Sequence, residues 1–92
     1  MAQKIRCSHI LTEKHSQALA ALERIKNGES FEKVAKEVSL CPSRKRGGDI
    51  GFFGRGMMVK EFEQAAYNLE VGQMTQEPVK TQFGYHIILR TA

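Results

Sequence analysis

Tryptophan is absent from the 92-residue sequence, and proline and cysteine occur only twice each. Two cysteines, Cys7 and Cys41, are too few for the disulfide framework of a small secreted domain, so the fold must rely on a hydrophobic core. No stretch of about 18 apolar residues occurs, which excludes a membrane-spanning helix, and residues 1–11 lack the apolar region of a signal peptide. We therefore expect a cytoplasmic protein with free thiols, and a Cys7–Cys41 disulfide is the less favoured alternative.

The motifs of common cofactor and metal enzymes are also missing. The sequence contains no P-loop, GxGxxG, HExxH or Ser/His/Asp constellation. A zinc site from Cys7, His9, Cys41 and His86 is a weak hypothesis, because no C-x-x-C or H-x-x-x-H pair is present. We expect no cofactor and no metal.

Hydrophobic residues make up 41% of the chain and charged residues 26%, which is typical of a folded protein, and the length suits one domain over residues 1–92. The net charge is +4, with its densest cluster at Arg44, Lys45 and Arg46. This cluster could contact an anionic membrane surface or nucleic acid. The other basic residues are scattered among glutamates, so an ordinary solvated surface is the favoured interpretation.

Hydrophobic periodicity predicts an α+β domain with a mostly antiparallel sheet. Alternating patterns predict strands over 4–11, 48–53, 76–82 and 83–91, and patterns of period 3.6 predict helices over 13–27, 30–38 and 62–69. Leu19, Leu22 and Ile25 are the expected buried stripe of the first helix, with Ala18 and Ala21 beside it. Pro78 favours an edge position for its strand, and the β-branched residues of 83–91 favour a central one.

Glycine is concentrated in one segment, CPSRKRGGDIGFFGRGMM at 41–58, which holds five of the eight glycines within ten residues. Glycine allows positive φ angles and close approach of another chain. On its own, this run with its flanking arginines suggests a cradle for phosphate or RNA.

Two histidines fall inside predicted strands, His9 in the first and His86 in the last. A buried imidazole needs partners for both ring nitrogens. Because the two strands are expected to be neighbours, we expect the rings to hydrogen-bond to each other, with Thr81 or Ser8 as a further partner. The spacing alone favours a structural polar pair over a catalytic one.

Cys41 and a group of large apolar residues are the remaining candidates. Cys41 lies between an apolar helix face and the basic cluster, where it is either a thiolate nucleophile or a small buried hydrophobic residue. Met57, Met58, Phe62 and Phe83 lie near predicted loops. Met58 and Phe62 are four residues apart at a helix start, so they belong either to the core or to an exposed apolar pocket.

These residues together resemble the parvulin family of peptidyl-prolyl cis/trans isomerases over nearly the whole chain. The resemblance rests on CSHIL at 7–11, CPS…RGGDIGFFGRGMM at 41–58, EFEQAAYNL at 61–69 and QFGYHIILRT at 82–91. It implies the order βαααβαββ, with about four helices around a four-stranded sheet. It also implies a monomeric enzyme that binds proline-containing peptides and flexible protein segments and aids protein folding.

The resemblance assigns roles to particular residues. His9 and His86 correspond to a paired core histidine motif, Thr81 to the hydroxyl that joins it, and Cys41 to the position beside the prolyl amide. A second set is expected to bind substrate: Ile50, Met58, Phe62, Gln82 and Phe83.

The sequence departs from phosphorylation-directed parvulins in a way that bears on substrate choice. The segment 12–17 is short and contains a single lysine, where those enzymes carry a long basic loop, so selectivity for phosphoserine-proline is not expected. Phe83 replaces a small polar residue and favours hydrophobic residues before proline. A chaperone-like module that binds extended segments without catalysis is the main alternative function.

Overall fold

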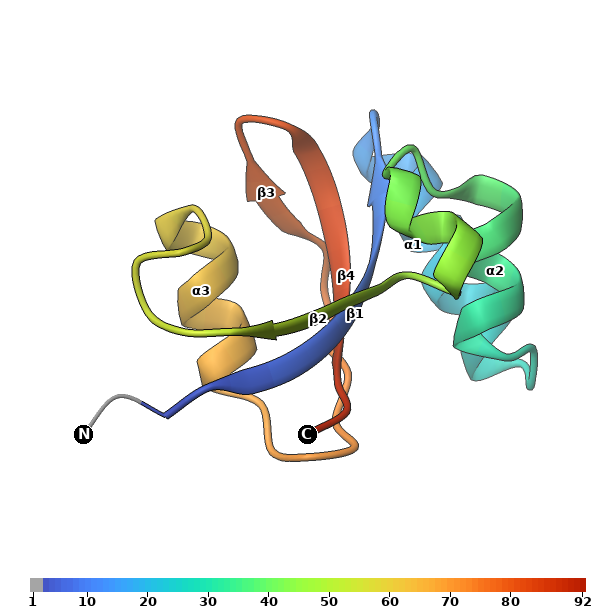
Figure 1. Cartoon of the computed structure of the whole chain (residues 1–92). Helices are drawn as coiled ribbons and strands as arrows, with labels where there is room; N and C mark the ends of the chain where they lie inside the picture. The colour runs from blue at the N-terminus through green and yellow to red at the C-terminus, as the bar shows by residue number, and fades with distance from the viewer. Residues whose placement is uncertain (1–2) are drawn as a thin grey trace.

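A computed structural model describes residues 3–92 of the protein. Its elements follow the order β1 (Ile5–Thr12), α1 (His15–Lys26), α2 (Phe31–Val38), the 3₁₀ helix η1 (Pro42–Arg46), β2 (Asp49–Phe53), α3 (Lys60–Tyr67), β3 (Val79–Thr81) and β4 (Gly84–Arg90). The strands form one antiparallel sheet in the order β2-β1-β4-β3. Helices α1 and α2 lie on one face of this sheet and α3 on the other (Figure 1). The α+β fold and the order of elements are as predicted, with η1 as the fourth helix.

The strand positions follow from local sequence. β4, rich in β-branched residues, is central and pairs with β1 and β3. β3 begins directly after Pro78 and lies at the sheet edge, where a missing N–H removes no ladder bond. A hairpin joins β3 to β4, and Gly84 at the start of β4 has φ 137°. A side chain at Gly84 would lie 2.3 Å from the carbonyl oxygen of Thr12, so this turn requires glycine.

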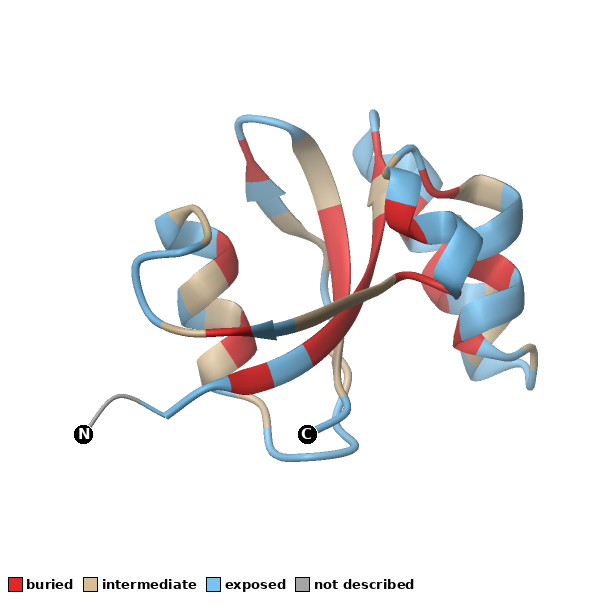
Figure 2. Cartoon of the chain, in the orientation of Figure 1, coloured by how far each residue is buried: buried red, intermediate tan, exposed pale blue. Residues whose placement is uncertain are grey.

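The sheet separates two hydrophobic clusters, which explains why consecutive residues of both central strands are buried, 7–10 in β1 and 86–88 in β4 (Figure 2). Ile10 and Ile87 point toward α1 and α2, whereas Cys7 and Ile88 point toward α3. Successive residues of β1 and β4 thus alternate between the clusters, because side chains in a strand point to opposite faces.

One position of the predicted buried stripe of α1 was wrong. The buried positions of α1 are Ala18, Ala21 and Leu22, and the partly buried Ile25 packs beside them, whereas Leu19 is 45% exposed. The four core-facing positions are spaced i, i+3, i+4 and i+7, and two are alanines. Small residues let α1 pack closely, so the stripe is rotated away from the larger Leu19.

The basic segment that follows α2 forms the short helix η1. Ser30 caps α2, its Oγ accepting the Lys33 N–H at 3.1 Å. Beyond Cys41, η1 carries the basic cluster and ends at Gly47, which is left-handed with φ 68°.

Within residues 3–92, no helix is long and apolar enough to cross a membrane.

Candidate active site

The pairing of β1 with β4 brings His9 and His86 together. His9 lies opposite Ile88 and His86 opposite Leu11, so the histidines occupy diagonal positions on one sheet face. Their Nδ1 atoms are 3.0 Å apart, and the rings are stacked with centroids 5.2 Å apart. The predicted contact between the two rings is confirmed.

Thr81 completes this network. Its Oγ1 accepts the N–H of Phe83 at 3.1 Å and lies 2.7 Å from His86 Nε2. We expect the hydroxyl to donate its proton to His86 Nε2, which would place the His86 proton on Nδ1, between the two rings. His9 Nε2 is a buried atom without a hydrogen-bond partner in the described part of the chain.

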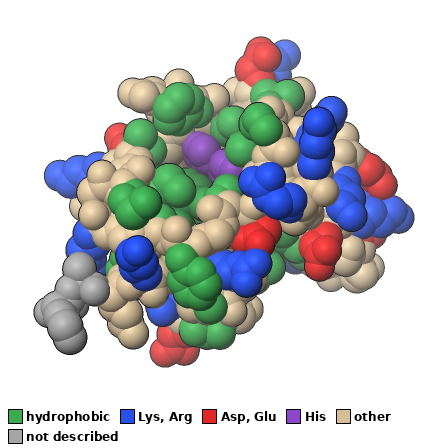
Figure 3. Space-filling view, in the orientation of Figure 1, with side chains coloured by type: hydrophobic (Ala, Val, Ile, Leu, Met, Phe, Trp, Pro, Cys, Tyr) green, Lys and Arg blue, Asp and Glu red, His purple; other side chains and the backbone are tan. Residues whose placement is uncertain are grey.

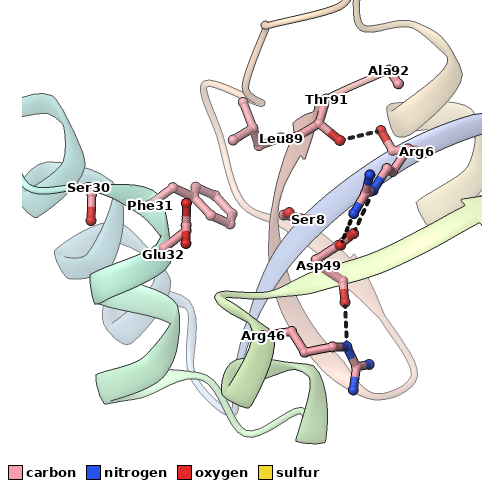
Figure 4. Close-up of a pocket in the computed structure, with 10 residues that line it drawn as sticks. All are labelled: Arg6, Ser8, Ser30, Phe31, Glu32, Arg46, Asp49, Leu89, Thr91 and Ala92. Carbon is pink, nitrogen blue, oxygen red and sulfur yellow. Dashed lines mark hydrogen bonds and ion pairs between the residues drawn. The ribbon is translucent and has the colours of Figure 1, made fainter.

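The alternative partner, Ser8, does not join the network. As the neighbour of His9 in a strand, Ser8 points to the opposite face of the sheet. It lines a separate cavity of about 450 Å³ behind the sheet, beside Phe31 and the Arg6–Asp49 ion pair (Figure 4). Strand alternation therefore excludes Ser8, and this larger cavity is distinct from the histidine site.

Burial keeps both imidazoles neutral. His9 is 6% and His86 4% exposed. Desolvation lowers the pKa of His86 to about 4, and desolvation together with the nearby His86 lowers the pKa of His9 to about 4. A pair with such pKa values is uncharged at neutral pH and is poorly suited to general acid–base catalysis there.

Phe62 of α3 packs on the pair and links it to the core. Its ring meets the rings of His9 and His86 edge-on, with centroid distances of 5.5 and 5.3 Å. It also contacts Phe53 at 5.9 Å. The polar pair is therefore shielded by aromatic edges, which maintains its low pKa.

The glycine-rich run supports the site through its backbone. Gly48 has φ 90°, and its carbonyl accepts the His9 N–H at 2.9 Å. A Cβ at Gly48 would lie 2.5 Å from the His9 carbonyl oxygen, so only glycine fits here. The close approach of another backbone segment to the glycine-rich run is thus confirmed at Gly48. The neighbouring segment is strand β1 of the same molecule.

Ser39 holds Cys41 near the histidines. Its Oγ accepts the N–H of Leu11 at 3.1 Å and that of Cys41 at 3.3 Å, which ties the end of α2 to β1. Ser39 is 1% exposed. Sequence reasoning missed it, because a serine at a helix end gives no sign of which distant strand it contacts.

Both cysteines are free, but their surroundings differ. Cys7 is fully buried, and desolvation raises the pKa of its thiol to about 11, partly opposed by the positive charge of Arg90. Cys7 is therefore protonated and inert at neutral pH. Cys41 is partly exposed, and it is the thiol that faces the candidate site.

An apolar pocket of about 210 Å³ opens directly above the histidine pair. Figure 3 shows histidine recessed between hydrophobic side chains in a hollow of the surface. The pocket is lined by His9, Cys41, Ile50, Met58, Val59, Phe62, Phe83 and His86. Seven of these eight were singled out from the sequence. Val59 was not, since it lies in an irregular segment without periodicity.

Two predicted site residues are outside the pocket wall. Thr81 is buried beneath it and acts on the site through His86. Gln82 is exposed in the β3–β4 turn beside Phe83 and does not line the pocket.

Residues 3–92 contain no group of three or more His, Cys, Asp or Glu side chains able to hold a metal ion.

A buried histidine pair thus lies below a small apolar pocket, the arrangement that the resemblance to parvulins implied. The chain belongs to the PPIC-type PPIase domain family, or rotamases, whose model matches residues 9–92.

Relatives with a known name or structure support this family assignment. The chain is 54% identical over 86 residues to the foldase protein PrsA of Geobacillus kaustophilus, covering 92% of this chain and 30% of the relative. The crystal structure of PrsA from Bacillus subtilis superposes with a TM-score of 0.93 at 46% identity, covering 97% of this chain and 35% of that one. The chain thus spans about a third of these relatives.

A single-domain relative matches from end to end. The parvulin NmPin of Nitrosopumilus maritimus is 53% identical with a TM-score of 0.86, and the match covers 100% of this chain and 99% of that one. The fold of this chain is therefore shared with a relative of nearly the same length.

Proposed function

We propose that the domain accelerates rotation about X-Pro peptide bonds in flexible protein segments, by non-covalent catalysis in the pocket above His9 and His86. The observation that carries this proposal is the size and chemistry of the pocket. At about 210 Å³ it is smaller than the roughly 300–1,000 Å³ of sites for drug-sized ligands, and it suits one compact apolar side chain. A proline ring matches that description.

The physics of the reaction explains how such a pocket would catalyse. The planar X-Pro amide is stabilised by resonance, and the barrier to rotation is about 20 kcal/mol. The twisted transition state has lost much of the amide's charge separation. Its transfer from water into an apolar pocket therefore costs less hydration free energy than transfer of the planar ground state. An apolar, water-excluding pocket wall of Met58, Phe62 and Phe83 thus favours the twisted form. Each 1.36 kcal/mol of this preference is worth a factor of ten in rate.

Cys41 is proposed to act on the substrate carbonyl electrostatically or through a weak hydrogen bond. Covalent attack by its thiolate is the alternative. We expect Cys41→Asp to retain activity, because an acidic side chain can still interact with the amide through its charge. Complete loss of activity in Cys41→Asp, with Cys41→Ser as the size-matched comparison, would favour the nucleophile instead.

The preferred residue before proline is proposed to be hydrophobic. Phe83 is 60% exposed at the pocket rim, and no lysine or arginine lines the pocket among the described residues. Exchange NMR on peptides with leucine, glutamate or phosphoserine before proline tests this. Phe83→Ser should reduce the advantage of the leucine peptide, and a faster rate for the phosphoserine peptide would contradict the proposal.

A chaperone-like function is the second candidate. Large hydrophobic side chains are exposed on both sides of the pocket, including Leu40, Met57 and Phe83. A structural relative from Campylobacter jejuni, 36% identical with a TM-score of 0.90, is described as a SurA-like chaperone. Binding of proline-free peptides with the same affinity as their proline-containing counterparts would favour this function over isomerisation.

We further propose a cytoplasmic monomer whose basic cluster contacts anionic surfaces weakly. The support is the partly exposed free thiol of Cys41, which a reducing compartment preserves, and the grouping of Arg44, Lys45 and Arg46 on one short helix. Sedimentation tests the monomer. Vesicle binding that decreases with salt and disappears when all three cations are changed to alanine would support the contact, and unchanged binding would exclude this cluster.

A further inference from the structure

The segment 54–59 between β2 and α3 supplies the pocket residues Met58 and Val59, although it contains no helix or strand. Its internal hydrogen bonds are weak. The Met57 N–H reaches the Gly54 carbonyl only at 3.4 Å, and the Gly54 N–H points to the Met57 sulfur at 3.2 Å. Something outside the segment must therefore fix the position of the Met58 wall.

Glu63 provides that external support. It follows Phe62 in the first turn of α3, and its carboxylate Oε1 accepts the Gly56 N–H at 2.6 Å. The side chain is only 16% exposed. A short, charge-assisted bond to a backbone amide is among the stronger hydrogen bonds in proteins. Gly56 has φ 85°, a conformation that orients this amide and favours glycine.

Arg55 extends the same contact to the rest of α3. Its guanidinium lies 3.5 Å from Glu63 Oε2 and stacks on the Tyr67 ring, 4.3 Å from the centroid. The Tyr67 hydroxyl in turn donates to the Gln3 carbonyl at 2.6 Å. The segment is thus attached to one face of α3 through Glu63 and Tyr67, while Phe62 of the same helix lines the pocket.

From this geometry we infer that Glu63 is a positioning residue that sets the distance between the Met58 and Phe62 walls of the proline pocket. It does not line the pocket and acts through Gly56 and Met58. Adjacent helix residues point about 100° apart, so α3 directs Phe62 into the pocket and Glu63 toward the segment that carries Met58. This inference rests on the proposed isomerase function for its kinetic consequence only.

Three variants test the inference, with KM and kcat measured on an Ala-Leu-Pro peptide. Glu63→Ala removes the acceptor of the Gly56 N–H, and we expect KM to increase about fivefold with kcat changed less than twofold, the pattern of lost binding. Glu63→Gln keeps an amide oxygen for Gly56 and should restore KM to within twofold of the wild type. Glu61→Ala is the matched control, since Glu61 is an exposed acid in the same helix turn.

A spectroscopic readout separates this inference from the proposed activity. In Glu63→Ala, the ¹³C shift of the Met58 methyl should move toward the rotamer-averaged value, and the Gly56 amide should exchange with solvent at least tenfold faster. Both signals should be unchanged in Glu61→Ala. Absence of isomerase activity in the wild type would overturn the proposed function alone. Wild-type-like Met58 and Gly56 signals in Glu63→Ala would overturn the role of Glu63.

Discussion

Lowering the pH from 7 to 5 should weaken the fold through the His9–His86 pair. An unfolded histidine has a pKa near 6.5, and burial lowers the pKa of both rings to about 4. Between these values the unfolded chain binds protons that the folded chain excludes. The stabilisation is therefore complete above pH 6.5 and is lost progressively as the pH falls toward 4.

The size of the effect follows from the same values. One pKa unit corresponds to 1.36 kcal/mol, and pH 5 lies 1.5 units below the unfolded pKa. Each ring should then lower the free energy of unfolding by about 2 kcal/mol at pH 5, and the pair by about 4 kcal/mol. The acids with a lowered pKa, Glu29 beside Arg24 and Asp49 beside Arg6, contribute in the same direction but mainly below pH 5, where their unfolded forms become protonated.

Urea unfolding at pH 7, 6 and 5, followed by circular dichroism at constant ionic strength, measures this dependence. His15→Ala is the control, because His15 is an exposed histidine on α1, outside the buried pair. Titration of the His9 and His86 ring ¹³C shifts gives the two pKa values directly. A free energy of unfolding that is constant from pH 7 to 5, or ring pKa values near 6.5, would refute the reasoning.

Two further predictions concern the same site. Gly48→Ala should lower the free energy of unfolding by at least about 2 kcal/mol more than Gly51→Ala, since both glycines have positive φ but only a Cβ at Gly48 would clash with the His9 backbone; equal losses by urea unfolding would contradict this. Long-range ¹H–¹⁵N spectra should show the proton of His9 on Nε2 and that of His86 on Nδ1, and the reverse tautomers would mean that Thr81 accepts its hydrogen bond from His86.

Much of the fold was predictable because local patterns determined it. The i, i+3, i+4 spacing of Phe31, Val34 and Ala35 identified the buried face of α2, and Pro78 identified an edge strand. The error at Leu19 arose where residue size competed with periodicity. The prediction centred the buried face on the large leucines, whereas close packing of α1 centres it on Ala18 and Ala21, which were expected beside the stripe.

The pocket wall was predictable mainly through family resemblance, whereas its supports were not. Val59, Ser39 and Glu63 carry no distinctive local pattern. Ser39 and Glu63 act through hydrogen bonds to Leu11 and Gly56, and such contacts depend on how the chain folds back on itself. Ser8 shows the converse case, because strand alternation alone could have excluded it from the histidine network.

The most direct test of the central claim is the cis/trans exchange rate of an Ala-Leu-Pro peptide with wild type, Met58→Ser and Val71→Ser. Met58 lines the pocket, whereas Val71 is a comparably apolar residue, 62% exposed and outside it. We predict acceleration at micromolar wild-type protein, a loss of about tenfold in Met58→Ser, and a rate within twofold of wild type in Val71→Ser. No acceleration by the wild type, or equal rates for all three proteins, would contradict catalysis in the apolar pocket.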